Sequence, residues 1–309
     1  MRRKVNRVGE STLTVSLPRA WVRYHGVKKG DELNVRIHGP ALEITTDARN
    51  TDRNISLALE GVDRSTLVFF LRYHYRAGAH SVSIRLPEPE IEHHRYGTRI
   101  PVRKIVEDEV RTLPGVRIEA HSESSFTLEI AEEADFGSFD TNLRKAFFII
   151  SASLEHLTQE REKGWFDDAL EIQANFTRHI SLCYRLLNNF GFSDFRQTLF
   201  LQSMLDSLEM IADIIEDVSR NVHEEEATID EKTFEIVRMI DEHIKLFTKF
   251  YYSFSIERAV EINDRRVEIE ARIGKLARKR LADARILSKL ATVTLVIRNV
   301  IGIRCGLER

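Results

Sequence analysis

Apolar and polar side chains alternate along two short stretches near the start of the chain, residues 12–17 and 33–37. In the first stretch, leucine and valine alternate with threonine and serine. In the second, leucine, valine and isoleucine alternate with asparagine and arginine. A period of two predicts strands that each have one apolar face. Fewer than 50 residues with so few apolar side chains cannot close a hydrophobic core alone, so this segment is predicted to need a second copy.

A short helix is predicted between these two strands. Pro18 suits a first helical turn, where a missing N–H costs no hydrogen bond, and Gly26 suits the left-handed end that follows Trp21–His25. The sequence KKGD at 28–31 then predicts a tight turn. The predicted order is strand, one or two helical turns, turn, strand and strand.

Residues 52–133 predict a small α/β segment with the order β-α-β-α-β-β. Strands are predicted over 55–61, 81–86, 116–120 and 126–130, and the last two form a hairpin. Helices are predicted over 65–79 and 99–113, and a loop with two prolines over 87–97. The loop carries His93 and His94 beside two glutamates. Adjacent side chains rarely converge on one ion, so a solvated loop is favoured over a metal site.

Long amphipathic helices begin at Ser138, where apolar residues recur at steps of four and three as a bundle requires. Gly164 breaks the first helix, and the third begins at a Ser193/Asp194 cap. The other predicted helices cover 165–190, 193–222, 231–254, 257–280 and 283–304. These helices form either one six-helix bundle or two three-helix units in tandem. Helices four to six repeat the order of the first three, which favours an internal duplication.

An α+β multidomain protein is therefore predicted, with domains at 1–48, 49–135 and 136–309. The chain has 309 residues, of which 30% are charged, as expected for a soluble and largely helical protein. Cys183 and Cys305 form no C-x-x-C pair, which argues against a disulfide scaffold or zinc ribbon and fits a reducing cytoplasm. No apolar run follows the basic start, so no secretory signal peptide is predicted. The longest apolar stretch, 290–297, is shorter than the roughly 20 residues of a membrane span, so no membrane insertion is predicted.

The first 47 residues are basic in a chain that is acidic overall. Nine cations and five anions give +4 (9 − 5), whereas the whole chain carries −2. A small dimeric β unit with concentrated positive charge fits a DNA-binding device. The cations predicted to grip DNA are Arg2, Arg3, Lys4, Arg7, Arg19 and Arg23. The hydroxyls predicted to donate hydrogen bonds to phosphates or bases are those of Thr12, Thr14 and Ser16.

A stripe of carboxylates follows one face of the third bundle helix. At about 100° per residue, Asp206, Glu209, Asp213 and Asp217 share a face that adjoins the apolar one. Glu209 and Asp213 stack one turn apart, where like charges repel unless a cation lies between them. The stripe has two interpretations: a site for a hard or borderline metal cation, or an ordinary acidic face exposed to solvent. The pattern alone favours the solvent face.

The first 47 residues resemble a swapped-hairpin domain of the AbrB/SpoVT/MazE type. The matching stretches are KVNRVGESTLTVSLPRAWV, HGVKKGDELNV and the strand ALEI. The resemblance implies a β-barrel-like dimer of swapped hairpins that binds DNA. Hairpin domains of this type also occur in antitoxin-like partners, so the fold alone does not fix the function.

Residues 138–309 resemble the helical region of PhoU proteins, with its two three-helix repeats. LEMIADIIEDVSR at 208–220 is similar to the family signature L-E-R-I-x-D-x-x-x-N-I-A-E. The whole arrangement of hairpin domain, α/β segment and bundle resembles the archaeal proteins called phosphate uptake regulators. In PhoU relatives, paired E/D-x-x-x-D motifs on neighbouring helices bind iron or zinc. The resemblance therefore implies metal positions at Glu209, Asp213 and Asp217, and in the second repeat at Asp264 and Glu268.

Each repeat departs from the PhoU pattern at half of its motif pair. In the first repeat, the partner helix has Asn175, Thr177, Arg178 and His179 where carboxylates are expected. In the second, Val296 and Val300 stand at the acidic positions of the signature helix. A divalent, iron or zinc ion is therefore kept as an alternative to a protein that requires no cofactor.

An enzyme is not predicted, because no Ser/His/Asp, Cys/His or glycine-rich phosphate motif is present. The spacing Glu-x-x-His of a di-iron oxidase occurs at Glu90 and His93, outside the bundle. The leading hypothesis is a cytoplasmic, dimeric or higher-order DNA-binding transcriptional regulator linked to phosphate uptake or homeostasis. Its bundle would sense a phosphate-related signal or bind a protein. The alternatives are a signalling adaptor that acts on a transporter or another regulator without binding DNA, and a metal-binding bundle protein.

Overall fold

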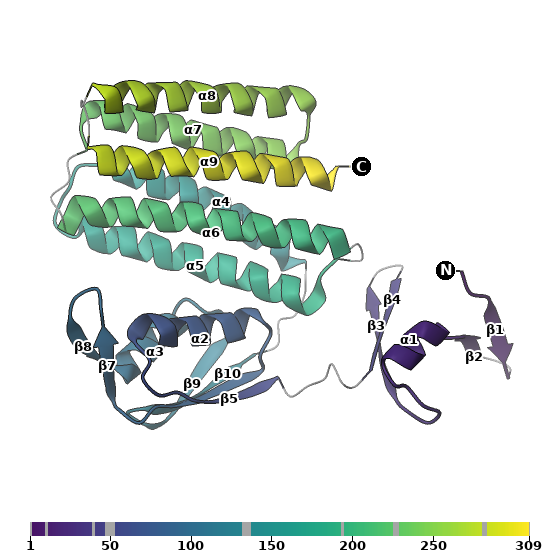
Figure 1. Ribbon diagram of the computed structural model, residues 1–309. Helices are drawn as coiled ribbons and strands as arrows, with labels where there is room; N and C mark the ends of the chain where they lie inside the picture. Colours follow the sequence, from purple (N-terminus) through teal and green to yellow (C-terminus); the bar gives the residue numbers. More distant parts are fainter. Residues whose placement is uncertain are drawn as a thin grey trace. The chain divides into compact units, whose positions relative to one another are not determined.

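The computed structural model shows an α+β protein (Figure 1). It describes residues 2–9, 12–38, 41–46, 53–131, 137–192, 195–224, 229–279 and 283–308. The chain divides into two compact units, Met1–Arg53 and Asn54–Arg309. The helix cap predicted at Ser193 and Asp194 lies outside the described residues.

The first unit contains two β hairpins and one short helix. Its elements are β1 Val5–Val8, β2 Thr12–Val15, α1 Arg19–Tyr24, β3 Leu33–His38 and β4 Ala41–Thr46. β1 pairs with β2 and β3 pairs with β4, in separate antiparallel sheets of two strands. No closed barrel forms among the described residues, because neither hairpin has a further strand on its open edges. The described residues of one chain therefore do not form the barrel-like unit by themselves, and the swapped dimer that the resemblance implies stays a prediction.

The local signals around the short helix are confirmed. Pro18 precedes α1 as its N-cap, and Gly26 follows the helix with φ +67°, a left-handed conformation that glycine adopts without a steric penalty. The turn at 28–31 is closed by a hydrogen bond of 2.7 Å from the Lys28 backbone N–H to the Asp31 carboxylate. Strand β1 was not predicted.

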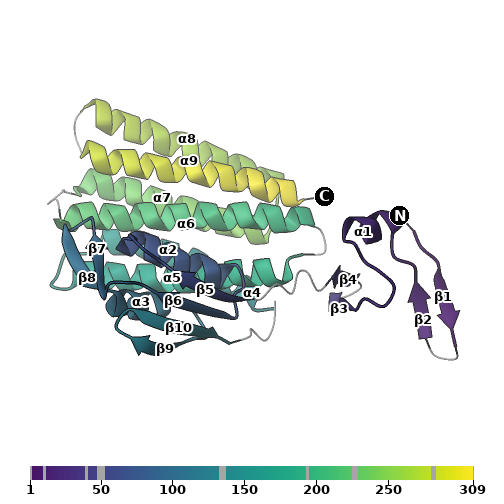
Figure 2. The same cartoon turned by 60° about the horizontal axis from the view of Figure 1, so that its bottom comes forward.

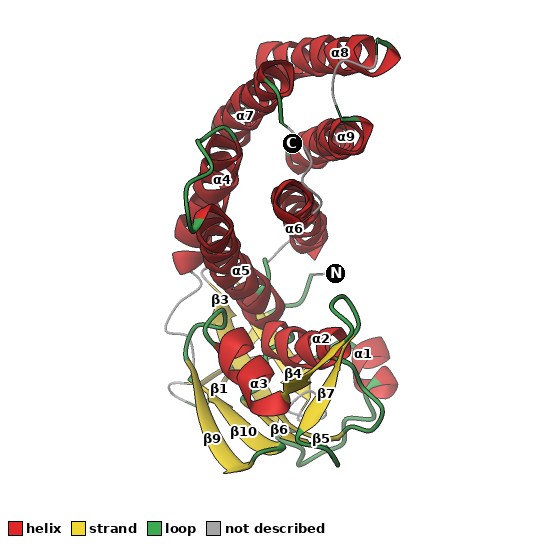
Figure 3. Ribbon diagram, turned by 90° about the vertical axis from the view of Figure 1, so that its left-hand side faces the viewer, coloured by secondary structure: helices red, strands yellow, loops and turns green. Residues whose placement is uncertain are grey.

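The second unit begins with a four-stranded sheet covered on one face by two helices (Figure 3). Its elements are β5 Asn54–Ala58, α2 Arg64–Arg76, β6 Ser81–Arg85, β7 Glu90–His93, β8 Thr98–Pro101, α3 Val102–Val110, β9 Val116–Ser122 and β10 Ser125–Ile130. The sheet order is β5-β6-β10-β9, with β5 parallel to β6 and the other pairs antiparallel. Side chains from the sheet, α2 and α3 form one apolar core, including Leu67, Val82 and Phe126.

The predicted loop at 87–97 is wrong, because this stretch contributes to a hairpin of β7 and β8. Ile91 of β7 is buried in the apolar core opposite Ile100 of β8, which fixes the register. The observed order is therefore β-α-β-β-β-α-β-β. The hairpin also delays α3, which begins after Pro101 instead of at 99. His93 stacks on Tyr96 with ring centres 4.7 Å apart, and His94 stays exposed, so the two histidines do not converge.

The remaining elements of the second unit are long helices, as predicted. They are α4 Ser138–Leu157, α5 Trp165–Phe190, α6 Phe195–Glu224, α7 Glu231–Tyr252, α8 Ile256–Arg278 and α9 Ala284–Leu307. Helices α5, α4, α7 and α8 lie side by side in one curved layer, and α6 and α9 pack together against its inner side (Figure 3). The apolar positions predicted for the first helix, from Leu143 to Leu157, are buried in a second core that these helices share.

One described helix, α9, is long and apolar enough to cross a membrane, with a mean hydropathy of 1.6 over its most apolar 18 residues. Half of that window is buried inside the protein, against α6, α7 and α8. The core helix of a soluble protein has the same properties, so α9 is weak evidence for a membrane span.

Candidate functional site

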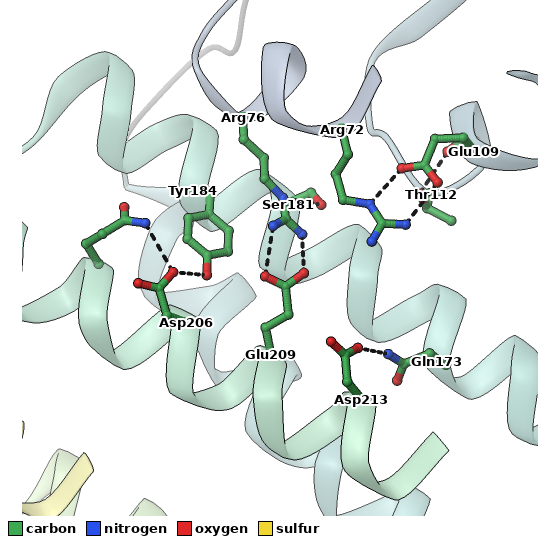
Figure 4. A network of polar contacts seen from close by, with 11 residues as sticks. Arg72, Arg76, Glu109, Thr112, Gln173, Ser181, Tyr184, Asp206, Glu209 and Asp213 are labelled. Carbon is green, nitrogen blue, oxygen red and sulfur yellow. Dashed lines mark hydrogen bonds and ion pairs between the residues drawn. The ribbon is translucent and has the colours of Figure 1, made fainter. Parts of the chain in front are cut away.

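The carboxylates of α6 meet polar side chains of α2 and α5. The apolar face of α6 is confirmed, since Leu205, Leu208, Ala212 and Ile215 are all buried in the helical core. From the adjoining face, Asp206, Glu209 and Asp213 extend toward side chains of the two neighbouring helices (Figure 4). The stripe therefore forms an internal contact at Glu209, whereas Asp206 and Asp213 remain exposed.

Glu209 forms an ion pair with a buried arginine from α2. Arg76 donates two hydrogen bonds to the Glu209 carboxylate, from Nη1 to Oε2 at 2.8 Å and from Nη2 to Oε1 at 2.6 Å. Only 2% of the Arg76 surface is exposed. A bidentate guanidinium–carboxylate pair in such surroundings is strong and directional. The cation that compensates Glu209 is thus a side chain of the same protein.

Neighbouring residues hold Arg76 in its orientation. Its Nε donates to the Ser181 hydroxyl at 3.2 Å, and its guanidinium carbon lies 4.4 Å from the centre of the Tyr184 ring. The Tyr184 hydroxyl donates to Asp206 at 2.6 Å. Burial, with Glu209 nearby, raises the pKa of Tyr184, so the phenol stays protonated and remains a donor. Arg76 therefore connects α2 to both α5 and α6.

Two more arginines lie near this contact: Arg72 ties α2 to α3 within the α/β segment, and Arg185 connects α5 to the end of α2. Arg72 of α2 binds Glu109 of α3 in a bidentate manner, at 2.7 and 2.9 Å. Arg185 of α5 is 1% exposed and donates from Nη1 to the carbonyl oxygens of Tyr75 and Ala79, at 2.9 and 2.8 Å. The Tyr75 carbonyl lies in the last turn of α2, where the helix dipole favours a cation, and Ala79 follows the end of that helix. The two apolar cores are thus joined through charged groups.

Asp213 occupies a different environment one turn along α6. Its carboxylate accepts a hydrogen bond of 3.0 Å from the Gln173 amide, and no described arginine binds it in a bidentate manner. Partial desolvation in the groove, with Glu209 and Glu216 nearby, raises the pKa of Asp213 to about 6. The residue remains exposed at the open side, so solvent screening limits what this shift contributes to stability.

An open groove of about 740 Å³ runs along this face of α6. Three exposed apolar side chains, Phe69 and Tyr73 of α2 and Met210 of α6, flank it. Its charged lining residues are Arg72, Arg95, Asp206, Glu209, Asp213, Glu216, Asp217 and Arg220. Most of these charges are paired within the protein, which leaves an amphipathic surface for a ligand or partner.

The residues proposed as metal positions are not brought together. Asp217 forms an ion pair with Lys289 of α9, and Glu209 is bound by Arg76. Asp264 and Glu268 lie on α8, at a separate depression lined by residues of α7 and α8. Among the described residues, no group of three or more His, Cys, Asp or Glu side chains is arranged to hold a metal ion. Val296 and Val300 of α9 are buried in the helical core.

The partners of the stripe were not identified from the sequence. The predicted helix over 65–79 contains Arg72 and Arg76, and Arg76 lies 133 residues before Glu209. Their spacing of four residues places both arginines on one face of a helix that is otherwise rich in apolar and aromatic residues. That pattern was the available signal, although it does not identify which carboxylates the arginines would meet.

The predicted DNA contacts all lie in the first unit. Arg2, Arg3, Lys4, Arg7, Arg19 and Arg23 are exposed, as are Thr12, Thr14 and Ser16. In the register of β1 and β2, Thr12 and Thr14 face one side of the hairpin with Asn6 and Val8. Arg7 faces the other side, with Val5, Leu13 and Val15. The hairpin therefore separates a largely polar face from a largely apolar one, and Arg7 lies on the apolar one.

No family model, curated protein or solved structure matches this chain.

Proposed function

We propose that this protein is a dimeric DNA-binding transcriptional regulator whose N-terminal unit grips DNA. The main support for the proposal is that this unit has an excess of positive charge on exposed side chains. Residues 1–47 carry +4 and the remainder of the chain −6, because the total is −2. The six cations named above are all solvent-exposed. Such a concentration of positive charge attracts the phosphate backbone of DNA.

The need for a second copy is supported by the apolar surface of the same unit. None of its described side chains is buried, and Val5, Leu13 and Val15 are 63%, 69% and 47% exposed on one face of the hairpin. A domain with no buried side chain gains little stability from the hydrophobic effect. Exchange of hairpins between two copies would cover this face and form the swapped, barrel-like dimer that the AbrB-type resemblance implies.

In such a dimer, the side of the hairpin that bears Thr12 and Thr14 would remain open to DNA. Arg19 and Arg23 lie one turn apart on α1 and would contact phosphates beside it. Lys4 precedes the first strand and adds a further contact. Arg7 lies on the side that the partner hairpin would cover, and it would reach a phosphate from the rim of the dimer interface.

The helices of the second unit would act as the sensor. Helices α4 to α6 and α7 to α9 follow the same order, and the corresponding helices α4 and α7, and α6 and α9, pack against each other. This supports the two three-helix repeats that the PhoU resemblance implies. The signal would be related to phosphate supply.

The direct test is a mobility-shift titration of the full chain with its own upstream DNA. We expect binding at low salt that is lost in a Lys4/Arg7/Arg19 triple alanine variant. A matched control replaces three exposed lysines of the second unit, Lys104, Lys145 and Lys163, which lowers the net charge equally. The proposal is wrong if the triple variant keeps full affinity at physiological salt, or if the control loses as much.

A signalling adaptor that does not bind DNA is the second candidate, and the groove beside α6 favours it. The exposed Phe69, Tyr73 and Met210 at the groove are the type of side chains that anchor protein partners. Under this alternative, the partner would be a phosphate transporter or another regulatory protein. Absence of DNA binding at low salt, with a dimeric chain, would select it.

A further inference from the structure

Strand β9 forms one edge of the four-stranded sheet. It pairs with β10 on one side, and no described strand pairs with its other side (Figures 2 and 3). The strand is seven residues long and contains no proline. Backbone N–H and C=O groups along such an edge form a template for another strand.

The same edge exposes apolar surface. Val116 and Ile118 of β9 face the helix-covered side of the sheet, opposite Ile130 and Leu128 of β10. Both are only half-buried, as is Val110 of α3. With neighbouring residues they line a depression of about 470 Å³ between the edge and α3. Covering this surface would gain hydrophobic free energy.

The charges on the opposite side of β9 favour a second copy of the same strand as the partner. Arg117 and Glu119 are both exposed and lie two residues apart. When two copies of β9 pair antiparallel with Ile118 opposite Ile118, each Arg117 lies opposite the Glu119 of the other copy. Centring the pair on residue 119 would place the two glutamates against each other. Opposite charges directly across a strand pair stabilise it and like charges destabilise it, so the strand is self-complementary in one register.

We propose that β9 pairs antiparallel with β9 of a second copy of this chain about a two-fold axis at Ile118. The two four-stranded sheets then become one continuous sheet, and the strips formed by Val110, Val116 and Ile118 cover each other. This contact is separate from the N-terminal unit and does not rest on DNA binding. In a chain that also dimerises through its N-terminal unit, it supplies a second subunit contact.

Disulfide cross-linking in the full chain tests the register. Opposite residues of an antiparallel pair have Cα atoms about 4.5–5.5 Å apart, within the range of a disulfide. An Ile118→Cys variant made in a Cys305→Ser background is expected to form a covalent dimer on mild oxidation. Cys183 is fully buried, and burial raises the pKa of its thiol, so it does not interfere. In the matched control Arg117→Cys, the two cysteines are out of register and should link at about a tenth of that yield or less.

Charge reversal tests the specificity. In the Ile118→Cys background, Arg117→Glu alone and Glu119→Arg alone each set like charges across the axis. Each should lower the cross-linked fraction by about an order of magnitude at low salt. Co-expression of the two variants restores opposite charges and should restore linking between them. Thermal melts check that each variant is folded. This control is needed because Arg117 lies opposite Glu129 of its own chain, so Arg117→Glu also places two carboxylates opposite each other within one sheet.

Three outcomes would overturn the proposal. The first is that the Ile118→Cys variant links no better than Arg117→Cys. The second is that the single charge reversals link as well as their parent. The third is a link to a different protein, which a non-reducing gel shows as a different mass. The last outcome would assign the edge to a foreign strand.

Discussion

Replacing Glu209 by glutamine removes the negative charge that Arg76 binds and keeps the size of the side chain. The guanidinium then stays buried with a neutral amide in place of its carboxylate. Removal of one partner from a buried ion pair costs about 3–5 kcal/mol. The Glu209 side chain is 18% exposed, and Ser181 and Tyr184 still contact Arg76. We therefore expect a loss at or just below the lower end of that range, about 2–3 kcal/mol of unfolding free energy.

The assay is reversible urea or thermal unfolding of the full chain, monitored at the helical signal of the second unit. For a unit of this size, each kcal/mol shifts the midpoint by about 2–4 °C, so Glu209→Gln should lower it by about 4–12 °C. The loss should appear without any change in metal content, because Arg76 and not an ion supplies the compensating charge.

Asp213→Asn is the matched control, one helical turn away on the same stripe. Asp213 is exposed, bonds only an amide among its described hydrogen-bond partners, and has a raised pKa, so its charge is not favoured by the fold. We expect a change within about 0.5 kcal/mol. A Glu209→Gln variant as stable as the parent protein would contradict the stabilising role of the Arg76–Glu209 ion pair. A shared metal site would give a different pattern. Asp213→Asn would then lose as much stability as Glu209→Gln, and added metal would stabilise the parent protein but neither variant.

Two further predictions concern buried basic side chains of the long helices. His243 of α7 is fully buried, and neither ring nitrogen has a hydrogen-bond partner among the described residues. Burial lowers its pKa from 6.5 to about 4, and the nearby Arg265 and Arg266 act in the same direction. The unfolded chain therefore binds an extra proton between these values, and stability is lost as pH falls from 6.5 to 4. His243→Leu should reduce the slope of unfolding free energy by up to about 1.4 kcal/mol per pH unit near pH 5, and an unchanged slope would contradict the assignment. Arg185→Lys keeps the charge but not the planar donor geometry, and should cost about 1–3 kcal/mol with faster hydrogen exchange at the C-terminal end of α2. Hydrogen exchange at the wild-type rate in that part of α2 would show that the hydrogen bonds of Arg185 are dispensable.

The sequence was most informative where one period governs a long stretch. Six long helices could be placed within a few residues, because apolar steps of three and four persist over several turns and glycine marks their ends. The hairpin of β7 and β8 was missed because Pro87, Pro89 and Gly97 outweighed one short alternation around Ile91. β1 was missed for a related reason, since four residues are too few for a period to be distinguished.

Prediction of the candidate site from the sequence was limited in a different way. The acidic face of α6 follows from helical geometry, and its carboxylates were identified correctly as a group. Their environment depends on Arg76 and Gln173, which lie on two other helices and come from distant parts of the sequence. Periodicity defines the face of a single helix, but it does not predict which helix packs against that face. An ion pair and a metal site therefore could not be distinguished until the helices were placed.

We propose that the N-terminal unit binds DNA through its cations, and the salt dependence of DNA affinity tests this most directly. Affinity for the protein's own upstream DNA would be measured by fluorescence anisotropy between about 50 and 200 mM salt, conditions in which counterion release dominates. The slope of log affinity against log salt should be steeply negative. In the Lys4/Arg7/Arg19 triple alanine variant, it should become shallower by about 0.9 for each cation that contacts a phosphate. Equal slopes for the variant and the parent protein would contradict the claim.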